Sequence, residues 1–152
     1  MKMTLAGSIS AALKAAWSLT GAGTVTSIAF PSKDWYDAQY ASKPQVTVSH
    51  LTDPPAKYFA VSGGSMLMHS NPRFVVNCWV PILRGASGTA EASLIEDMRR
   101  EVTRIIIANR NSIASFNPIV PENEGTPHHE INGTPAMLRY EITLVGTQDT
   151  TA

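Results

Sequence analysis

The run with the strongest metal-ligating character is His128-His129-Glu130, in the C-terminal third of the chain. Imidazole and carboxylate groups are common ligands of zinc and manganese. Because neighbouring residues of an extended chain point to opposite sides, only His128 and Glu130 could bind the same ion. His50 and His69 would have to come from elsewhere in the fold. The run leaves two interpretations open, a solvated loop and the site of a small metal-dependent α+β enzyme.

Cys78 is the single cysteine, so the chain cannot form an internal disulfide. A nucleophilic thiol needs exposure and a neighbouring base that lowers its pKa. Cys78 lies instead between Val76 and Val80 in an apolar strand pattern. We therefore expect it to pack in the core, as small buried cysteines commonly do.

The glycine-rich segment 85–89 separates a predicted strand from a predicted helix, a position where backbone N–H groups can bind phosphate. A phosphate-binding loop also requires a lysine directly after its second glycine, and Thr89 follows Gly88 here. We interpret the segment as a connection, and the sequence predicts no cofactor.

The predicted long helix carries acids and bases at helical spacing. Glu96 and Arg100 stand at i, i+4, and Glu101 and Arg104 stand at i, i+3, where opposite charges meet on a helix surface. This pattern favours a salt-bridge lattice that is solvated or faces another subunit over acid–base catalysis. Arg99, Arg100 and Arg104 are therefore the charged candidates for an interface.

Three aromatic side chains, Trp35, Tyr36 and Tyr40, gather in the expected loop 31–44. Large aromatic residues are enriched among the anchors of protein interfaces. They can equally fold back as a lid on the core of their own subunit. The sequence leaves both interpretations open.

The elements that must position these residues follow from hydrophobic periodicity and from helix and turn signals. Thr4 is expected to cap the first helix and Gly21 to end it, and Thr89 is expected to cap the second. The expected elements are a helix over 4–20, strands over 24–30, 45–51 and 73–83, a hairpin of 58–61 with 66–69, a helix over 89–111, an irregular loop over 111–135, a strand over 138–147 and a polar tail from 148.

This order predicts one α+β domain over 1–152, with a mostly antiparallel sheet of about four to six strands. The N-terminal helix and the long helix would pack on one face of that sheet. The connection through the long helix could place the strand 138–147 parallel to a neighbour.

Composition limits the class of protein further. Twelve basic and twelve acidic residues give a net charge of zero, which argues against a protein held mainly by nucleic-acid phosphates. There is no run of 18 apolar residues, so no membrane span is predicted. Lys14 interrupts a weak resemblance to a signal peptide, and the chain is expected to be a cytoplasmic product.

The layout resembles the tail terminator proteins of long-tailed bacteriophages, also called tail-to-head joining or tail completion proteins. The resemblance rests on element order and on strand character, and it spans nearly the whole chain. The segments that carry it are the strands Pro44 to Val48 and Arg73 to Val80, the helix end Ile105 to Asn109 and the closing strand Leu138 to Leu144. The loop 111–135 is longer than the family leads us to expect.

The resemblance implies a structural virion protein that is assembled in the host cytoplasm and forms a ring, in that family a hexamer. Such a ring caps the tail tube, stops its polymerisation and joins it to the connector of the head, while DNA passes through the lumen without specific binding. The family has no catalytic residues or cofactors. The alternatives are another neck or head-completion protein, typically a β-barrel, and a small-molecule sensor domain. If a ring forms, reversing the charge of Arg100 or Arg104 should change assembly more than folding.

Overall fold

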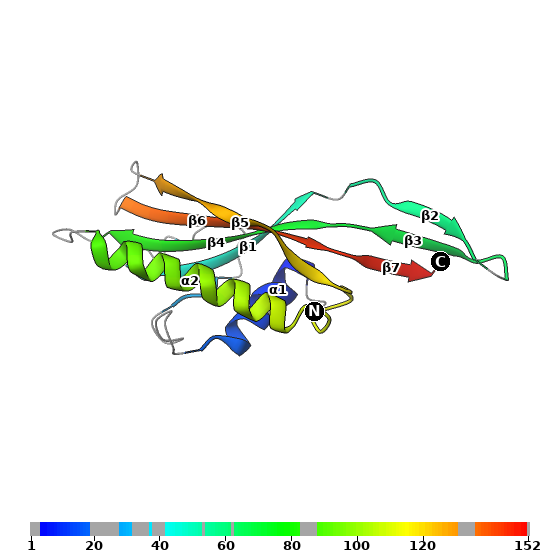
Figure 1. Ribbon diagram of the computed structural model, residues 1–152, viewed down its shortest axis with the longest axis horizontal. Helices are drawn as coiled ribbons and strands as arrows, with labels where there is room; N and C mark the ends of the chain where they lie inside the picture. Colours follow the sequence, from blue (N-terminus) through cyan, green and yellow to red (C-terminus); the bar gives the residue numbers. More distant parts are fainter. Residues whose placement is uncertain are drawn as a thin grey trace.

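We describe a computed structural model of the chain over residues 4–18, 28–31, 37, 42–52, 54–61, 63–82, 88–130 and 136–151; the side chains of 123–130 and 151 are outside this description. Within these residues the chain forms two helices and seven strands (Figure 1): α1 (Leu5–Ala16), β1 (Gln45–Thr52), β2 (Lys57–Ala60), β3 (Met66–Ser70), β4 (Arg73–Ile82), α2 (Thr89–Ala108), β5 (Ile119–Glu130), β6 (Ala136–Gly146) and β7 (Gln148–Thr151).

The main sheet, which we call sheet A, has the strand order β1-β4-β6-β5, and each neighbouring pair is antiparallel. Both helices lie on one face of it (Figure 1), where α1 packs against β1 and α2 crosses β4, β5 and β6. This arrangement confirms the α+β class and the packing of both helices on one face.

The core forms where the even-numbered side chains of β4 and β6 meet the helices. Phe74 stands opposite Leu144 and Val76 stands opposite Ile142, and all four are fully buried. Each fully buried aliphatic or aromatic side chain stabilises the fold by about 1.5–3 kcal/mol through the hydrophobic effect. The helices contribute the buried stripe predicted from their periodicity: Ile9 and Leu13 from α1, and Ile95, Met98, Val102, Ile105 and Ile106 from α2.

The ends of the helices agree only in part with the sequence signals. Thr4 caps α1, because its hydroxyl accepts a hydrogen bond of 3.0 Å from the N–H of Gly7. The helix ends at Ala16, and Gly21 lies outside the described residues. The expected cap at Thr89 is wrong: Gly88 occupies the N-cap position of α2 with a φ of +87°, a conformation that glycine adopts readily.

The expected loop over 111–135 is also wrong, because β5 occupies Ile119–Glu130. This strand is an edge strand that pairs with β6, and its register shifts between Pro121 and Asn123 and again between Asn123 and Thr126. Edge strands and bulges tolerate proline, so pairing with β6 overrides a composition that disfavours a strand. The irregular part that remains in the described residues is 109–118.

The connection through α2 differs from the expected crossover as well. The strand 138–147 is antiparallel to both of its neighbours, and β5 is the strand that runs parallel to β4. β4, α2 and β5 therefore form a crossover between two parallel strands. β6, which follows β5 in the sequence, lies between β4 and β5 in the sheet and separates them.

The second sheet, which we call the blade, consists of β2, β3 and β7 and extends away from the helices along the long axis of the molecule (Figure 1). The hairpin of β2 and β3 is confirmed, whereas the polar tail expected from 148 is wrong, because Gln148–Thr151 is a strand that pairs with β3. Only 71–72 separate β3 from β4, and only Thr147 separates β6 from β7. The blade therefore continues strands of sheet A beyond the helical layer.

Candidate functional site

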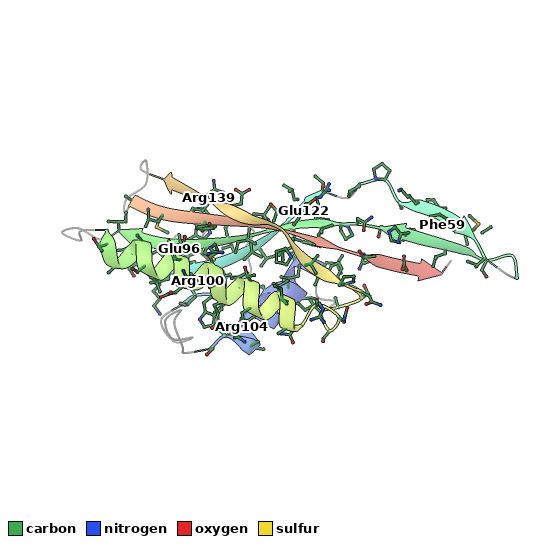
Figure 2. The ribbon with its side chains drawn as sticks, viewed as in Figure 1. Phe59, Glu96, Arg100, Arg104, Glu122 and Arg139 are labelled. Carbon is green, nitrogen blue, oxygen red and sulfur yellow. The ribbon has the colours of Figure 1, made fainter. Side chains whose placement is uncertain are left out.

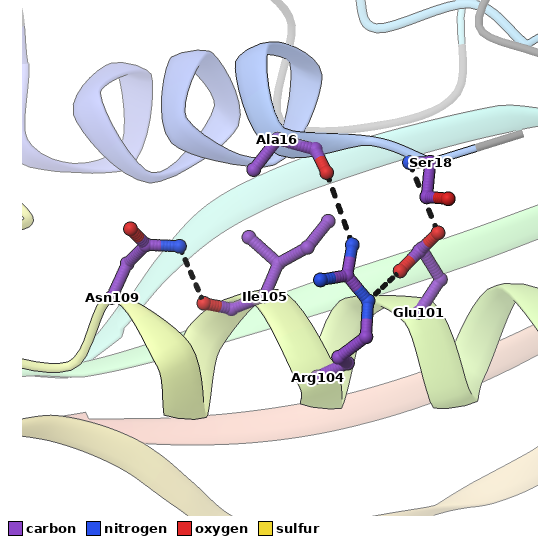
Figure 3. Close-up of polar contacts among 6 residues, drawn as sticks. All are labelled: Ala16, Ser18, Glu101, Arg104, Ile105 and Asn109. Carbon is purple, nitrogen blue, oxygen red and sulfur yellow. Dashed lines mark hydrogen bonds and ion pairs between the residues drawn. The ribbon is translucent and has the colours of Figure 1, made fainter.

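Arg104, predicted as an interface residue, joins the two helices of its own subunit (Figure 3). Its Nε donates a hydrogen bond to Oε1 of Glu101, and its Nη2 donates one of 3.1 Å to the carbonyl oxygen of Ala16 at the end of α1. Oε2 of Glu101 accepts a hydrogen bond of 3.0 Å from the N–H of Ser18. Because the Glu101 side chain is only 3% exposed, this cluster is part of the folded subunit.

Arg99 also has an internal role. It pairs with Glu96 at 3.1 Å, and its guanidinium carbon lies 5.5 Å from the centroid of the Tyr140 ring. The i, i+4 pair expected between Glu96 and Arg100 is therefore wrong. Arg100 instead lies 3.9 Å from Asp97 and is 70% exposed, so it is the most exposed of the three arginines.

A polar network covers part of the sheet A face opposite the helices. The indole N–H of Trp79 donates a hydrogen bond of 3.0 Å to the hydroxyl of Thr47. The guanidinium of Arg139 stacks 5.5 Å from the centre of the Trp79 ring and donates hydrogen bonds of 3.3 Å and 3.2 Å to Asn77 and Glu141. Buried polar groups with partners of this kind add rigidity to a sheet. The members of this network meet only through the strand register, so no pattern along the sequence identifies it.

The blade carries large apolar side chains in contact with solvent. Tyr58 is 62% exposed, Phe59 is 50% exposed and Met66 is 40% exposed. The register places Tyr58 opposite Met68 and Phe59 opposite Leu67, so Tyr58 and Phe59 point to opposite faces. The run Tyr58-Phe59-Ala60-Val61, which lacks polar alternation, is the sequence signal that could have identified this surface.

A hollow of about 910 Å³ lies beside the first half of α2, where the helix faces the ends of β4 and β6. Apolar groups of Ile82, Ala92 and Leu138 line it together with the charged side chains of Glu96, Asp97 and Arg100. Figure 2 shows Glu96 near one end of the molecule and Phe59 near the other. The hollow and the blade are therefore two different surfaces at opposite ends of the long axis.

Several candidates fall where the structure gives no side-chain description. Trp35, Tyr36 and Tyr40 lie outside the described residues, as do the side chains of His128, His129 and Glu130. Within the described part of the chain, no three metal-ligating side chains come together. The glycine-rich segment is described only from Gly88 onward.

Next to the aromatic loop, the amide of Gln45 binds the backbone of Asp37 twice. Its oxygen accepts a hydrogen bond of 2.8 Å from the N–H of Asp37, and its nitrogen donates one of 3.0 Å to the carbonyl oxygen. Gln45 is fully buried and stands opposite Trp79 in the sheet, so Asp37 lies against the face that holds the polar network. Asp37 is thus fixed to its own subunit, and the orientation of the three aromatic side chains stays open.

The position of Cys78 agrees with the prediction of a core residue. It is fully buried, and this burial raises the pKa of its thiol from 9.0 to about 12, against a smaller opposite effect of the positive charge of Arg99. The thiolate that a nucleophile or metal ligand requires is therefore strongly disfavoured.

We expect the Cys78 thiol of the folded protein to resist disulfide-exchange reagents at about pH 8 and to react fully in denaturant. Because its pKa is higher in the folded state, its contribution to stability is intact below about pH 9 and is lost as the pH rises toward about 12. The unfolding free energy, measured with urea, should therefore fall more steeply over that range in the wild type than in Cys78→Ala. Equal slopes in the two proteins would contradict the burial of the thiol.

In the described part of the chain, no helix is long and apolar enough to span a membrane. A comparison with protein-family models finds no match to this sequence, and a comparison with curated proteins finds none either.

Proposed function

We propose that the protein is a structural subunit of a virus particle, of the kind that ends a phage tail tube, and that it acts by assembling into a ring. The observation that carries the proposal is the blade, which extends from the folded core with exposed apolar side chains on both faces. Soluble monomers rarely expose apolar surface in this way unless it binds a partner.

The internal contacts of the subunit support this role. Arg99, Arg104 and Arg139 each have partners within the chain, so these three side chains contribute to the fold of the subunit. A ring requires two different patches on each subunit, joined by a contact that closes by rotation. The blade and the hollow beside α2 are two such patches.

The charge of the chain fits a conduit for DNA. Its net charge is zero, and a strongly cationic lumen would bind phosphates and slow the passage of the genome. The proposed partners are copies of the chain, the tail tube protein below the ring and the head connector above it, with DNA passing through. The proposed location is the tail or neck of the virion, after assembly in the host cytoplasm.

A head-completion protein of the β-barrel kind is the main rival. Sheet A is open, with β1 and β5 at its edges, and α2 spans 20 residues across one face. These features favour the tail terminator over the β-barrel alternative.

The purified protein is expected to form a ring of uniform size, alone or on addition of purified tail tube. Size-exclusion chromatography with light scattering gives the mass of the assembly, and negative-stain electron microscopy shows its shape. The complete ring should also stop the tube from growing when both are mixed. A protein that stays monomeric at high concentration and with tail tube present would refute the proposal.

A further inference from the structure

The β2–β3 hairpin of the blade carries apolar side chains on both of its faces, whereas β7 is polar. Tyr58, Met66 and Met68 project from one face, and Phe59 and Leu67 project from the other. Strands with apolar residues on both sides are normally buried on both sides. Both helices, however, lie against sheet A and not against the blade (Figure 1). The cover for the blade must therefore come from outside the described part of its own subunit.

The hollow beside α2 has the complementary character. It is an open depression of about 910 Å³, not an enclosed cavity, so a side chain of another molecule can reach it from solvent. It combines the apolar lining of Ile82, Ala92 and Leu138 with the carboxylates of Glu96 and Asp97 and the guanidinium of Arg100, so acidic groups outnumber basic ones in the lining. Each carboxylate also has an arginine partner on α2, Arg99 for Glu96 and Arg100 for Asp97. An aromatic group that arrives next to a positive charge fits such a lining.

The blade presents that combination on the face of Phe59. Lys57 is exposed and stands two residues before Phe59 in β2, so both side chains point to the same face, about 7 Å apart along the strand. A phenyl ring in the hollow would therefore bring the Lys57 ammonium group to the carboxylates of the hollow. Aromatic side chains seated in a pocket commonly dominate the energy of an interface.

We propose that the blade of one copy of the chain inserts into the hollow of the next copy, with Phe59 against the apolar lining and Lys57 against Glu96 and Asp97. The occupant is a second copy because the exposed phenyl group of Phe59 suits the apolar lining of the hollow, and the positive charge of Lys57 is opposite to that of its carboxylates. They lie at opposite ends of the molecule, as the positions of Phe59 and Glu96 in Figure 2 show. One molecule therefore cannot satisfy both surfaces by itself.

Such a contact is head-to-tail, and its repetition gives a closed ring or an open filament, according to the rotation between subunits. The inference rests on the proposed function, because it names the two patches by which the ring would close. It also makes a stronger claim, since a ring could form through other surfaces of the subunit.

The test uses two variants of the full chain, each of which disables one surface. Phe59→Asp places a charge on the blade, and Ala92→Arg fills the hollow from an exposed position of α2. Each variant alone should associate at least about tenfold more weakly than the wild type, because each loses an anchor of the interface. Mixed together, they retain one intact blade and one intact hollow, so they should form a one-to-one dimer and nothing larger.

Light scattering measures the masses, and circular dichroism with thermal melting verifies that both variants fold. Ile107→Asp is the matched control, since Ile107 is 47% exposed on α2 and contributes to neither surface. This variant should assemble as the wild type does. A loss of assembly equal to that of Phe59→Asp would show that any added charge disrupts the particle, and would overturn the inference.

The remaining outcomes separate the inference from the proposed function. Suppose that the wild type forms rings. If the mixed variants then stay monomeric, or if either variant forms rings alone, the blade and the hollow do not bind each other. The ring proposal stands in both cases. If the blade variant assembles normally but no longer binds tail tube, the occupant of the blade is the tube protein. If the wild type itself never assembles, both proposals fail.

Discussion

Replacing Arg104 with glutamate is expected to lower the free energy of unfolding by about 3 kcal/mol, the lower end of the range for breaking a buried ion pair. The new carboxylate would stand beside the buried carboxylate of Glu101, and the carbonyl oxygen of Ala16 would lose its donor. Half of the Arg104 side chain reaches solvent, so water compensates part of the loss. Urea unfolding followed by circular dichroism measures the change.

Arg100→Glu is the matched control on the same helix. The Arg100 side chain is 70% exposed and lies 3.9 Å from Asp97, so its replacement should change stability by no more than about 1 kcal/mol. Arg100 also lines the hollow, so this variant should alter assembly while the subunit stays folded. The expectation that reversal of either charge acts on assembly rather than on folding therefore applies to Arg100 only.

A double variant separates the ion pair from general damage to α2. Combining Glu101→Gln with Arg104→Met removes the buried charge together with its partner, so the loss should be smaller than the sum of the two single losses. If Arg104→Glu unfolds at the same urea concentration as Arg100→Glu, the contact between the helices contributes little to stability.

Truncating Phe116 to alanine is expected to destabilise the subunit by about 3–5 kcal/mol, as large-to-small changes of buried aromatic residues do. Phe116 is buried, and its ring lies 5.5 Å from the ring of Phe74 in an edge-to-face arrangement. It also covers Gly146, the last residue of β6, whose N–H donates a hydrogen bond of 2.9 Å to the carbonyl oxygen of Pro72. Phe116 thus closes the core at the junction between sheet A and the blade.

Gly146 supplies a test of this geometry. A Cβ atom at Gly146 would lie 2.5 Å from Cδ1 and 2.6 Å from Cε1 of Phe116, so Gly146→Ala alone should cost about 1–3 kcal/mol by overpacking. In the double variant the new methyl group enters the cavity that Phe116→Ala leaves. The combined loss, measured by urea unfolding, should therefore fall clearly below the sum of the single losses. Strict additivity would mean that the ring does not pack on Gly146.

The sequence predicts the elements whose periodicity is strong. The alternating side chains of β4 and β6 and the apolar stripes of α1 and α2 indicate both the elements and the faces they bury, because a two-layer fold needs those faces. Ile107, which stands outside the stripe of α2, is half exposed as its position implies.

The strand β5 could not be predicted from the same rules. Pro121, Pro127 and two shifts in register break the alternation by which strands are recognised. β5 forms a strand because it pairs with β6, and a pattern read along residues 119–130 alone does not reveal that pairing. β7 was missed for the same reason, since its four polar residues form a strand only because β3 has an edge open to them.

For the candidate interface residues too, the sequence predicts position within an element but not the contacts between elements. Spacing along α2 predicts which arginines lie on the helix surface, but it carries no information about where α1 ends. The bond from Arg104 to Ala16, which spans 88 positions, therefore appears only once the helices have packed. The sequence predicts that Tyr58 and Phe59 lie in a strand. It does not predict that their side chains are exposed, because that depends on how far the blade extends beyond the helices.

The place of β6 in sheet A has a consequence for the synthesis of the protein. β6 pairs with both β4 and β5, although it follows both of them in the sequence. While the chain emerges from the ribosome, the edge of β4 that faces β6 lacks its partner until residues 136–145 have left the exit tunnel. Sheet A therefore cannot be completed before β6 has emerged. Until then the unpaired edge of β4 is open to wrong partners, and a chaperone that shields unpaired strands would act during this interval.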